Sequence, residues 1–234
     1  MTRPGTTEAL TRFDPLAESY DAWFETPIGT FVESQETAML HRLVAPRPGQ
    51  RLLEVGSGTG YFLRALAQSG ARCVGIEPSA EMLAVASRAE AGLIDNLRGR
   101  GESLPFGPAT FDCVAYVTTL EFVADPAEAV REAARVCRPG GRIVCVVLNS
   151  RGPWFRQRQA EGGLWNTTHF YSAEELVTLL EPLGNVEIDY RVHLPPSLDR
   201  LPAVLMGLLD TLLRSLRRRD GALIGAMVKP GENP

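Results

Sequence analysis

Residues 52–62, LLEVGSGTGYF, place three glycines at alternate positions directly after a short apolar run. Gly56, Gly58 and Gly60 allow the main chain to adopt positive φ and allow a ligand to approach without a Cβ in the way. A plain turn between a strand and a helix needs one glycine, whereas this loop has three. The helix expected to begin near Thr59 would point free N–H groups at the same space. The spacing therefore predicts a ligand held against bare backbone.

Two carboxylates accompany the glycines and narrow the choice of ligand. Glu54 lies two residues before the first glycine, and Glu77 ends the next apolar run, VGIE. A carboxylate at the end of that strand is ionised at neutral pH and can accept hydrogen bonds from both hydroxyls of a ribose. The dinucleotide fingerprint G-x-G-x-x-G requires glycine where this chain has Tyr61, which disfavours a nicotinamide-dependent reductase.

Strand-like and helical patterns alternate from Arg51 onward. The strand-like runs cover residues 51–55, 71–77, 93–99, 111–117, 141–149, 185–194 and 222–228. The helical patterns cover residues 59–70, 79–90, 126–137, 172–184 and 201–219, after two helices in the first 45 residues. Strands nearly continuous in Val, Ile, Leu and Cys indicate a parallel sheet covered by helices on both faces. We expect Asp14 to cap the first helix before Pro15, and Ser172 with Glu175 to form a capping box.

Composition bounds the class of protein. Hydrophobic residues make up 44% and charged residues 22% of the 234 residues, and the formal net charge is −4, which weighs against a general polyanion binder. The four cysteines are widely spaced and include no C-x-x-C pair, so we expect a reduced, cytoplasmic protein without a metal site. The N-terminus, MTRPGTTEAL, lacks the apolar stretch of a secretory signal.

The stretch from 201 to 219 is strongly apolar but is interrupted by Asp210 and Arg214. Its uninterrupted part is too short to span a bilayer. We expect a helix that packs on its own domain or on a second copy in a homodimer. A helix lying in a membrane interface is the alternative.

Five sequence motifs follow one another along the chain: E-V-G-S-G-T-G, the acid at Glu77, ESLPF, FDCVAYVTTLEFVADP and RVCRPGGRIV. Together they resemble the class I S-adenosylmethionine-dependent methyltransferases with a Methyltransf-11-type core that act on small molecules. The resemblance is strong over residues 50–150. It implies a Rossmann-like, seven-stranded, mostly parallel sheet with helices on both faces, an antiparallel last strand and a helical N-terminal extension. Within a single structural domain we expect a helical cap at 1–45, the methyltransferase domain at 46–234 and a lid-like insertion at 150–171.

The resemblance also implies S-adenosyl-L-methionine as cofactor and S-adenosyl-L-homocysteine as product. Arg100 stands where many relatives have an acid, so backbone groups near Gly101 and Glu102 would reach the adenine instead. The cofactor-binding residues expected from the resemblance are Tyr20, Glu54, Gly56, Ser57, Gly58, Gly60, Glu77, Pro78, Gly101, Glu102, Ser103, Val117 and Thr118.

The acceptor is expected to be a small molecule, with the acceptor atom open among O, N, C and S. The fourth strand lacks the [DN]-P-P-[FY] element of enzymes that methylate amino groups of nucleic acids, so we expect no nucleic acid partner. Glu121 and His169 are the candidate catalytic bases, although either can serve a structural role. The alternative function is a non-catalytic module that binds the cofactor or its product and acts through a partner protein at residues 201–219.

Overall fold

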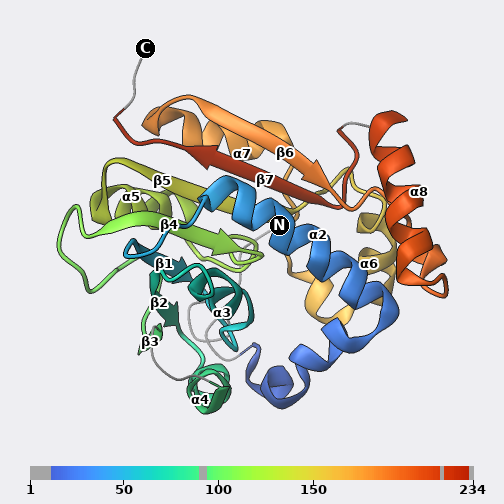
Figure 1. Cartoon of the computed structure of the whole chain (residues 1–234), viewed down its shortest axis with the longest axis horizontal. Coiled ribbons are helices and arrows are strands. Elements are labelled where there is room, and N and C mark those ends of the chain that lie inside the picture. The colour runs from blue at the N-terminus through green and yellow to red at the C-terminus, as the bar shows by residue number, and fades with distance from the viewer. Residues whose placement is uncertain (1–11, 90–93, 217–218, 232–234) are drawn as a thin grey trace.

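The computed structural model describes residues 12–89, 94–216 and 219–231, which build one seven-stranded sheet in the order β3-β2-β1-β4-β5-β7-β6 (Figure 1). The strands are β1 (Arg51–Val55), β2 (Arg72–Glu77), β3 (Ile94–Arg98), β4 (Phe111–Val117), β5 (Cys137–Leu148), β6 (Val186–Arg191) and β7 (Leu223–Val228). β7 is antiparallel to both of its neighbours, and the remaining neighbours pair in parallel. The expected mostly parallel sheet with an antiparallel last strand is confirmed.

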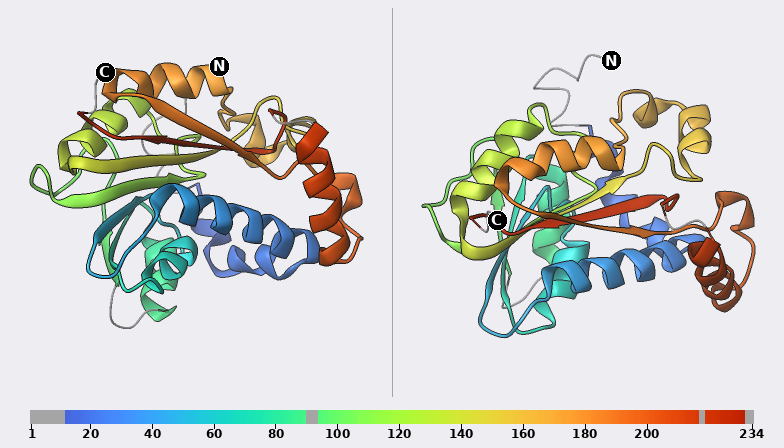
Figure 2. Two further views of the ribbon diagram at one scale, coloured as in Figure 1. Left: turned by 45° about the horizontal axis from the view of Figure 1, so that its top comes forward. Right: turned by 90° about the horizontal axis from the view of Figure 1, so that it is seen from above.

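Helices cover both faces of the sheet (Figure 2). They are α2 (Pro27–Val44), α3 (Tyr61–Ala67), α4 (Ala80–Ala89), α5 (Pro126–Val136), α6 (Phe155–Glu161), α7 (Ala173–Leu180) and α8 (Ala203–Leu216). One apolar core lies between the sheet and α2, α3 and α8, and the other lies between the sheet and α5 and α7. Successive strand residues feed opposite cores: Leu52 belongs to the first and Leu53 to the second. This alternation follows from the two-residue period of a strand.

The N-terminal segment differs from the expected single helix. It forms two short 3₁₀ helices, η1 (Asp14–Ser19) and η2 (Asp21–Glu25). The prediction that Asp14 is the N-cap is wrong, because Phe13 occupies that position without a side-chain cap. The Asp14 carboxylate instead accepts a hydrogen bond of 2.5 Å from the hydroxyl of Ser79. Asp14 therefore binds a side chain distant in sequence instead of capping its own helix.

Side-chain caps fix the starts of α5 and α7. Asp125 accepts a hydrogen bond of 3.0 Å from the backbone N–H of Glu128, and Ser172 with Glu175 forms the expected capping box. The stretch 150–171, which shows no helical period, nevertheless contains α6 and the 3₁₀ helix η3 (Gly163–Asn166). Two further 3₁₀ turns are η4 (Glu181–Leu183) and η5 (Pro196–Leu198). Residues 217–218 of the expected last helix, and the start of the expected cap at 1–11, lie outside the described residues.

The four cysteines are buried and free of disulfides. Across 12–89, 94–216 and 219–231, no helix combines the length and the apolar character that crossing a bilayer requires.

Candidate active site

The glycine loop after β1 is fastened to the end of β2. The backbone N–H of Gly56 donates to the carbonyl of Ile76 at 2.7 Å, and that of Ser57 donates to the same carbonyl at 3.1 Å. Gly56 has φ +72°, and a Cβ there would lie 2.2 Å from Cγ2 of Thr119, on the loop after β4. Only glycine fits this position, because it needs both the left-handed conformation and the space.

Gly58 and Gly60 also have positive φ, +54° and +77°. A Cβ at Gly58 would meet no atom within 4 Å, so the backbone here borders open space. Gly60 is the N-cap residue of α3, and its N–H donates to the carbonyl of Ser57 at 2.8 Å. The three glycines therefore adopt the positive φ that their spacing predicted, and at Gly58 the backbone borders open space.

Glu77 closes the loop from the end of β2. Its Oε2 accepts a hydrogen bond of 2.9 Å from the N–H of Gly58, and its Oε1 accepts one of 2.9 Å from the N–H of Ser79. Burial raises the pKa of this carboxyl, while the two backbone hydrogen bonds oppose the shift. Each carboxylate oxygen can accept a second bond, so two hydroxyls of a ribose fit this geometry.

A cleft follows the loop along the C-terminal ends of the parallel strands, where α/β folds bind ligands. The expected cofactor residues that line it are Tyr20, Gly56, Gly58, Glu77, Pro78, Gly101, Glu102, Val117 and Thr118. The other four do not line it: Glu54 and Ser57 are buried beside it, Gly60 is the N-cap of α3, and Ser103 forms an isolated bridge with Arg100. Arg100 itself lines the cleft.

Glu102 has a second role at the far end of this cleft. Its Oε1 accepts hydrogen bonds from the backbone N–H groups of Ala124, at 3.1 Å, and Asp125, at 3.4 Å. Arg100 donates to the same oxygen at 3.4 Å. The side chain therefore holds the loop after β4 in place, and the backbone at 101–102 is what remains available to a ligand.

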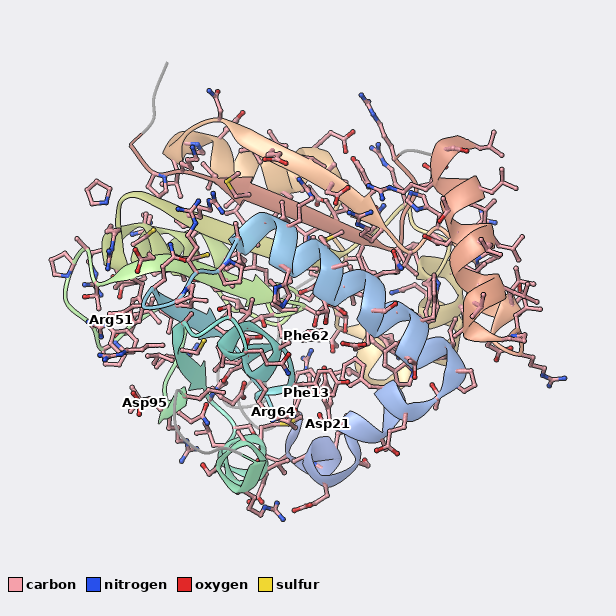
Figure 3. The ribbon with its side chains drawn as sticks, viewed as in Figure 1. Phe13, Asp21, Arg51, Phe62, Arg64 and Asp95 are labelled. Carbon is pink, nitrogen blue, oxygen red and sulfur yellow. The ribbon has the colours of Figure 1, made fainter. Side chains whose placement is uncertain are left out.

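The N-terminal segment fastens onto the glycine loop. The hydroxyl of Thr59 donates to Oδ1 of Asp21 at 2.6 Å, and Arg64 of α3 pairs with Oδ2 at 3.2 Å (Figure 3). Phe13 packs edge-on against Phe122 with ring centroids 4.9 Å apart. These contacts cover the cleft with the segment that carries Tyr20.

A second cavity of about 320 Å³ adjoins the cleft, and we call it the aromatic chamber. Its aromatic lining comes from the N-terminal segment, α3, the loop after β4 and the stretch 150–171. It consists of Phe13, Tyr20, Trp23, Phe24, Phe62, Phe122, Trp154, Phe155, Trp165 and Phe170. Four residues line both the chamber and the cleft: Phe13, Tyr20, Thr118 and Phe122. The two spaces therefore meet at these side chains.

Thr118 stands at this junction in a strained conformation. Its φ is +46°, a left-handed value that residues with a branched Cβ seldom adopt, and its N–H donates to the carbonyl of Val146 at 2.8 Å. Such strain persists where surrounding structure enforces it, and it is concentrated at functional sites.

Three glutamates are buried, Glu36 in the chamber wall and Glu54 and Glu121 outside the lining of both cavities. Glu36, Glu54 and Glu121 are each no more than 4% exposed, and each has one carboxyl oxygen without a hydrogen-bond partner among the described residues. Burial raises the pKa of each to about 8, and neighbouring acids add to the shift for Glu36 and Glu54. A cation placed among them would restore the ionised form of these carboxyls.

The two candidate bases take different places. Glu121 is buried, and its Oε1 accepts a hydrogen bond of 2.6 Å from the N–H of Leu148, but it lines neither cavity. His169 is not brought to the site: its ring stands edge-on to Tyr171, and its Nε2 lies 3.6 Å from the Glu175 carboxylate. Its backbone N–H donates to the carbonyl of Glu121 at 3.3 Å, so it helps to place the stretch 150–171.

Sequence reasoning missed Glu36 and the Asp21 contact. Glu36 lines the chamber from the buried face of α2, which also carries Val32, Met39 and Leu40. A glutamate at helical spacing among apolar residues is the signal that could have found it. Asp21 has no such signal, because its partners Thr59 and Arg64 are distant in sequence.

The fold, the glycine loop and the carboxylate after β2 define a Rossmann-like methyltransferase. Residues 53–145 match the model of the Methyltransf_11 family, a methyltransferase domain. The chain therefore contains a methyltransferase domain of this kind, whose cofactor is S-adenosylmethionine. The residues present fit that cofactor, because Glu77 can accept a ribose diol and the buried carboxyl of Glu54 has an oxygen to spare for a cation.

Similar proteins include an uncharacterized protein of Mycobacterium tuberculosis, 37% identical over 190 residues that cover 79% of this chain and 64% of that protein. This chain thus spans about two thirds of the length of that relative. A demethylmenaquinone methyltransferase of Clavibacter sepedonicus is 35% identical over 61% of this chain and 58% of its own length. In structure, a methyltransferase of Thermotoga maritima, described as a possible histamine N-methyltransferase, matches with a TM-score of 0.74 and 23% identity, covering 94% of this chain and 98% of that one.

Proposed function

We propose that this protein transfers a methyl group from S-adenosylmethionine to a small molecule with an apolar or aromatic body that enters the aromatic chamber. One observation carries the proposal: the cofactor cleft and the chamber share Phe13, Tyr20, Thr118 and Phe122. An acceptor in the chamber would thus border the cleft. The acceptor atom stays open among O, N, C and S.

The chain's own tasks are alignment, exclusion of water and removal of a proton where the acceptor carries one. The cofactor supplies an already activated methyl group. Aromatic side chains from the N-terminal segment and the stretch 150–171 line the chamber and would shield a bound acceptor from water. Trp154 is fixed there by a hydrogen bond of 2.9 Å from its Nε1 to the carbonyl of Leu194.

Relatives named as quinone methyltransferases support an aromatic acceptor. The Clavibacter protein is named a demethylmenaquinone methyltransferase, and another relative, of Rubrivivax gelatinosus, is named a ubiquinone/menaquinone biosynthesis C-methyltransferase. The mainly apolar lining of the chamber suits a ring system. A small-molecule acceptor is favoured on both grounds.

Of the two candidate bases, we propose Glu121, which lines neither cavity but acts electrostatically on Tyr20 and Glu36 in the chamber wall. Its unpartnered Oε2 and its pKa of about 8 suit proton transfer near neutral pH. His169 is retained only as a residue that positions the stretch 150–171. Glu121→Gln, measured with the true acceptor, should lower kcat. An unchanged rate would remove Glu121 from the chemistry.

The proposed function is tested by incubating the protein with methyl-labelled S-adenosylmethionine and a small-metabolite extract. Mass spectrometry should detect a labelled small product, and calorimetry should detect binding of S-adenosylhomocysteine. Binding of S-adenosylhomocysteine without any labelled product would favour the alternative of a cofactor-binding module that acts through a partner. No binding of either nucleoside would contradict both functions.

We further propose that α8 forms the contact surface of a homodimer. Its apolar face is exposed, with Val204 76%, Leu208 65%, Leu212 59% and Leu216 73% exposed. The opposite face is fixed by Asp210, whose Oδ1 accepts hydrogen bonds from the N–H groups of His193 and Leu194. Leucines that recur every three to four residues on one helix can interdigitate with a second copy across a twofold axis.

A further inference from the structure

Glu36 is a buried carboxyl group in the wall of the aromatic chamber. It lies in α2, is 4% exposed, and lines the chamber. Its Oε1 is buried and makes no hydrogen bond with the part of the chain that the structure describes. A buried polar atom left unpaired costs free energy, so a group of this kind indicates a partner that arrives from outside.

The rest of the chamber wall is suited to a positive charge. Tyr20, Trp23 and Phe24 line it together with Trp154 and Trp165. The faces of aromatic rings attract cations, most strongly for Trp. The stretch 150–171 already shows this interaction, because the guanidinium of Arg158 lies 4.4 Å from the centroid of the Trp165 ring and 5.3 Å from that of Trp154.

The two charged groups that act on the Glu36 carboxyl are both acids. Glu121 and Glu33 both act on its carboxyl electrostatically and favour its protonated form. Arg158 is the one basic side chain in the chamber lining, and its guanidinium is 3.1 Å from the carboxylate of Glu161. The inner wall thus presents a carboxyl group that lacks a counter-charge within the described lining.

We propose that Glu36 binds a basic nitrogen of the methyl acceptor, and that the acceptor is an amine whose apolar or aromatic body lies against the chamber's rings. The proposal rests on the proposed function and deepens it by naming the substrate class. An ammonium group beside Glu36 would pair with the ionised carboxyl, so each group stabilises the charged form of the other.

The test is calorimetric titration of the protein, saturated with S-adenosylhomocysteine, with matched pairs of amine and alcohol. The pairs are tryptamine with indole-3-ethanol, 2-phenylethylamine with 2-phenylethanol, and cyclohexylethylamine with cyclohexylethanol. At least one amine should bind about tenfold or more tightly than its alcohol, which is about 1.4 kcal/mol. If no amine binds more tightly than its alcohol, the proposal is overturned.

Two variants test whether Glu36 causes the preference for amines over alcohols. Glu36→Gln keeps the size of the side chain and should abolish the preference for the amine. Glu33→Gln, on the same helix but outside the chamber lining, should retain it. A preference that survives in a folded Glu36→Gln protein overturns the assignment. If that variant does not fold, Glu36→Asp replaces it and should reduce the preference, because the carboxylate withdraws by one methylene.

The affinity for S-adenosylhomocysteine, measured before any amine is added, separates this proposal from the proposed function. A protein that binds the nucleoside but shows no preference for amines remains a methyltransferase candidate with another acceptor class. A protein that does not bind the nucleoside contradicts the proposed function itself.

Discussion

The hydroxyl of Thr59, in the glycine loop, donates a hydrogen bond of 2.6 Å to Oδ1 of Asp21, in the N-terminal segment. Arg64 joins the same carboxylate and also donates to the carbonyl of Thr59 at 2.7 Å. Three groups from two parts of the chain therefore form one cluster beside the cofactor cleft. The cluster ties the segment that carries Tyr20 to the loop that borders the cofactor cleft.

Asp21→Ala should weaken binding of S-adenosylhomocysteine about tenfold, since a partly buried hydrogen bond to a charged group contributes about 1.5 kcal/mol or more. The dissociation rate should account for most of the change, because the cover over the cleft is loosened. Stopped-flow displacement measures it. Glu18→Ala is the matched control, because its pair with Arg88 is exposed and contributes little. Equal rates for the two variants would contradict the role of the cluster.

Glu77→Ala should weaken binding of the same nucleoside by about 1.5–3 kcal/mol, because two hydroxyls would lose a charged acceptor and the Gly58 N–H would lose its partner. Isothermal calorimetry is the direct measurement. Glu81→Ala, on the exposed start of α4, serves as the control. An affinity that Glu77→Ala leaves unchanged would refute the ribose assignment.

Two alanine substitutions in the glycine loop should have separate effects. Gly56→Ala places a methyl group 2.2 Å from Cγ2 of Thr119 at φ +72°, so it should lower the melting temperature and abolish binding. Gly58→Ala meets no protein atom within 4 Å, so its stability cost is limited to backbone strain of about 1–3 kcal/mol. It should still weaken nucleoside binding, because the methyl group enters the cleft. Thermal unfolding and calorimetry together distinguish the two variants.

The buried glutamates give stability a pH dependence of definite sign. The pKa of Glu36 is raised from 4.5 to about 8 by burial, with Glu121 and Glu33 adding to the effect. A raised folded-state pKa stabilises the protein fully below about 4.5, and the contribution is lost as pH rises through about 8. The free energy of unfolding should therefore fall between these values, by up to ~1.4 kcal/mol per pH unit for each such group.

Glu36→Gln should reduce the fall of the free energy of unfolding with pH, and so should Glu54→Gln. The pKa of the Glu54 carboxyl is likewise raised to about 8, by burial and by the nearby Glu36 and Glu77. Urea unfolding at a series of pH values measures the slope. Glu33→Gln provides the comparison on the same helix. A slope that neither Glu36→Gln nor Glu54→Gln alters would contradict the burial of these groups as protonated acids.

Leu208→Glu combined with Leu212→Glu should convert the proposed homodimer into a monomer, because both side chains are more than half exposed in the isolated chain and would be buried in a dimer. Light scattering coupled to size exclusion gives the mass. The same pair of substitutions should leave the melting temperature of the monomer nearly unchanged, since surface replacements have small effects. A wild-type protein that is monomeric at all concentrations would exclude the dimer.

Local patterns were sufficient for the sheet and for the loop at its edge. The apolar runs predicted the strands within a few residues, and the capping box at Ser172 and Glu175 forms as expected. Gly56, Gly58 and Gly60 adopt the positive φ that their spacing indicated. These features depend on neighbours within a few positions, which is why the sequence alone contains them.

The order of amino acids thus determined the class of fold, the glycine loop and the acid at Glu77 that borders the cofactor cleft. Only the tertiary structure decided three features of the site. They are the contact of Asp21 with Thr59, the position of His169 outside both cavities, and the position of Glu36 in the chamber wall. The physical reason is separation along the chain. Packing between α2, the N-terminal segment and the stretch 150–171 brings together residues whose local patterns carry no information about one another.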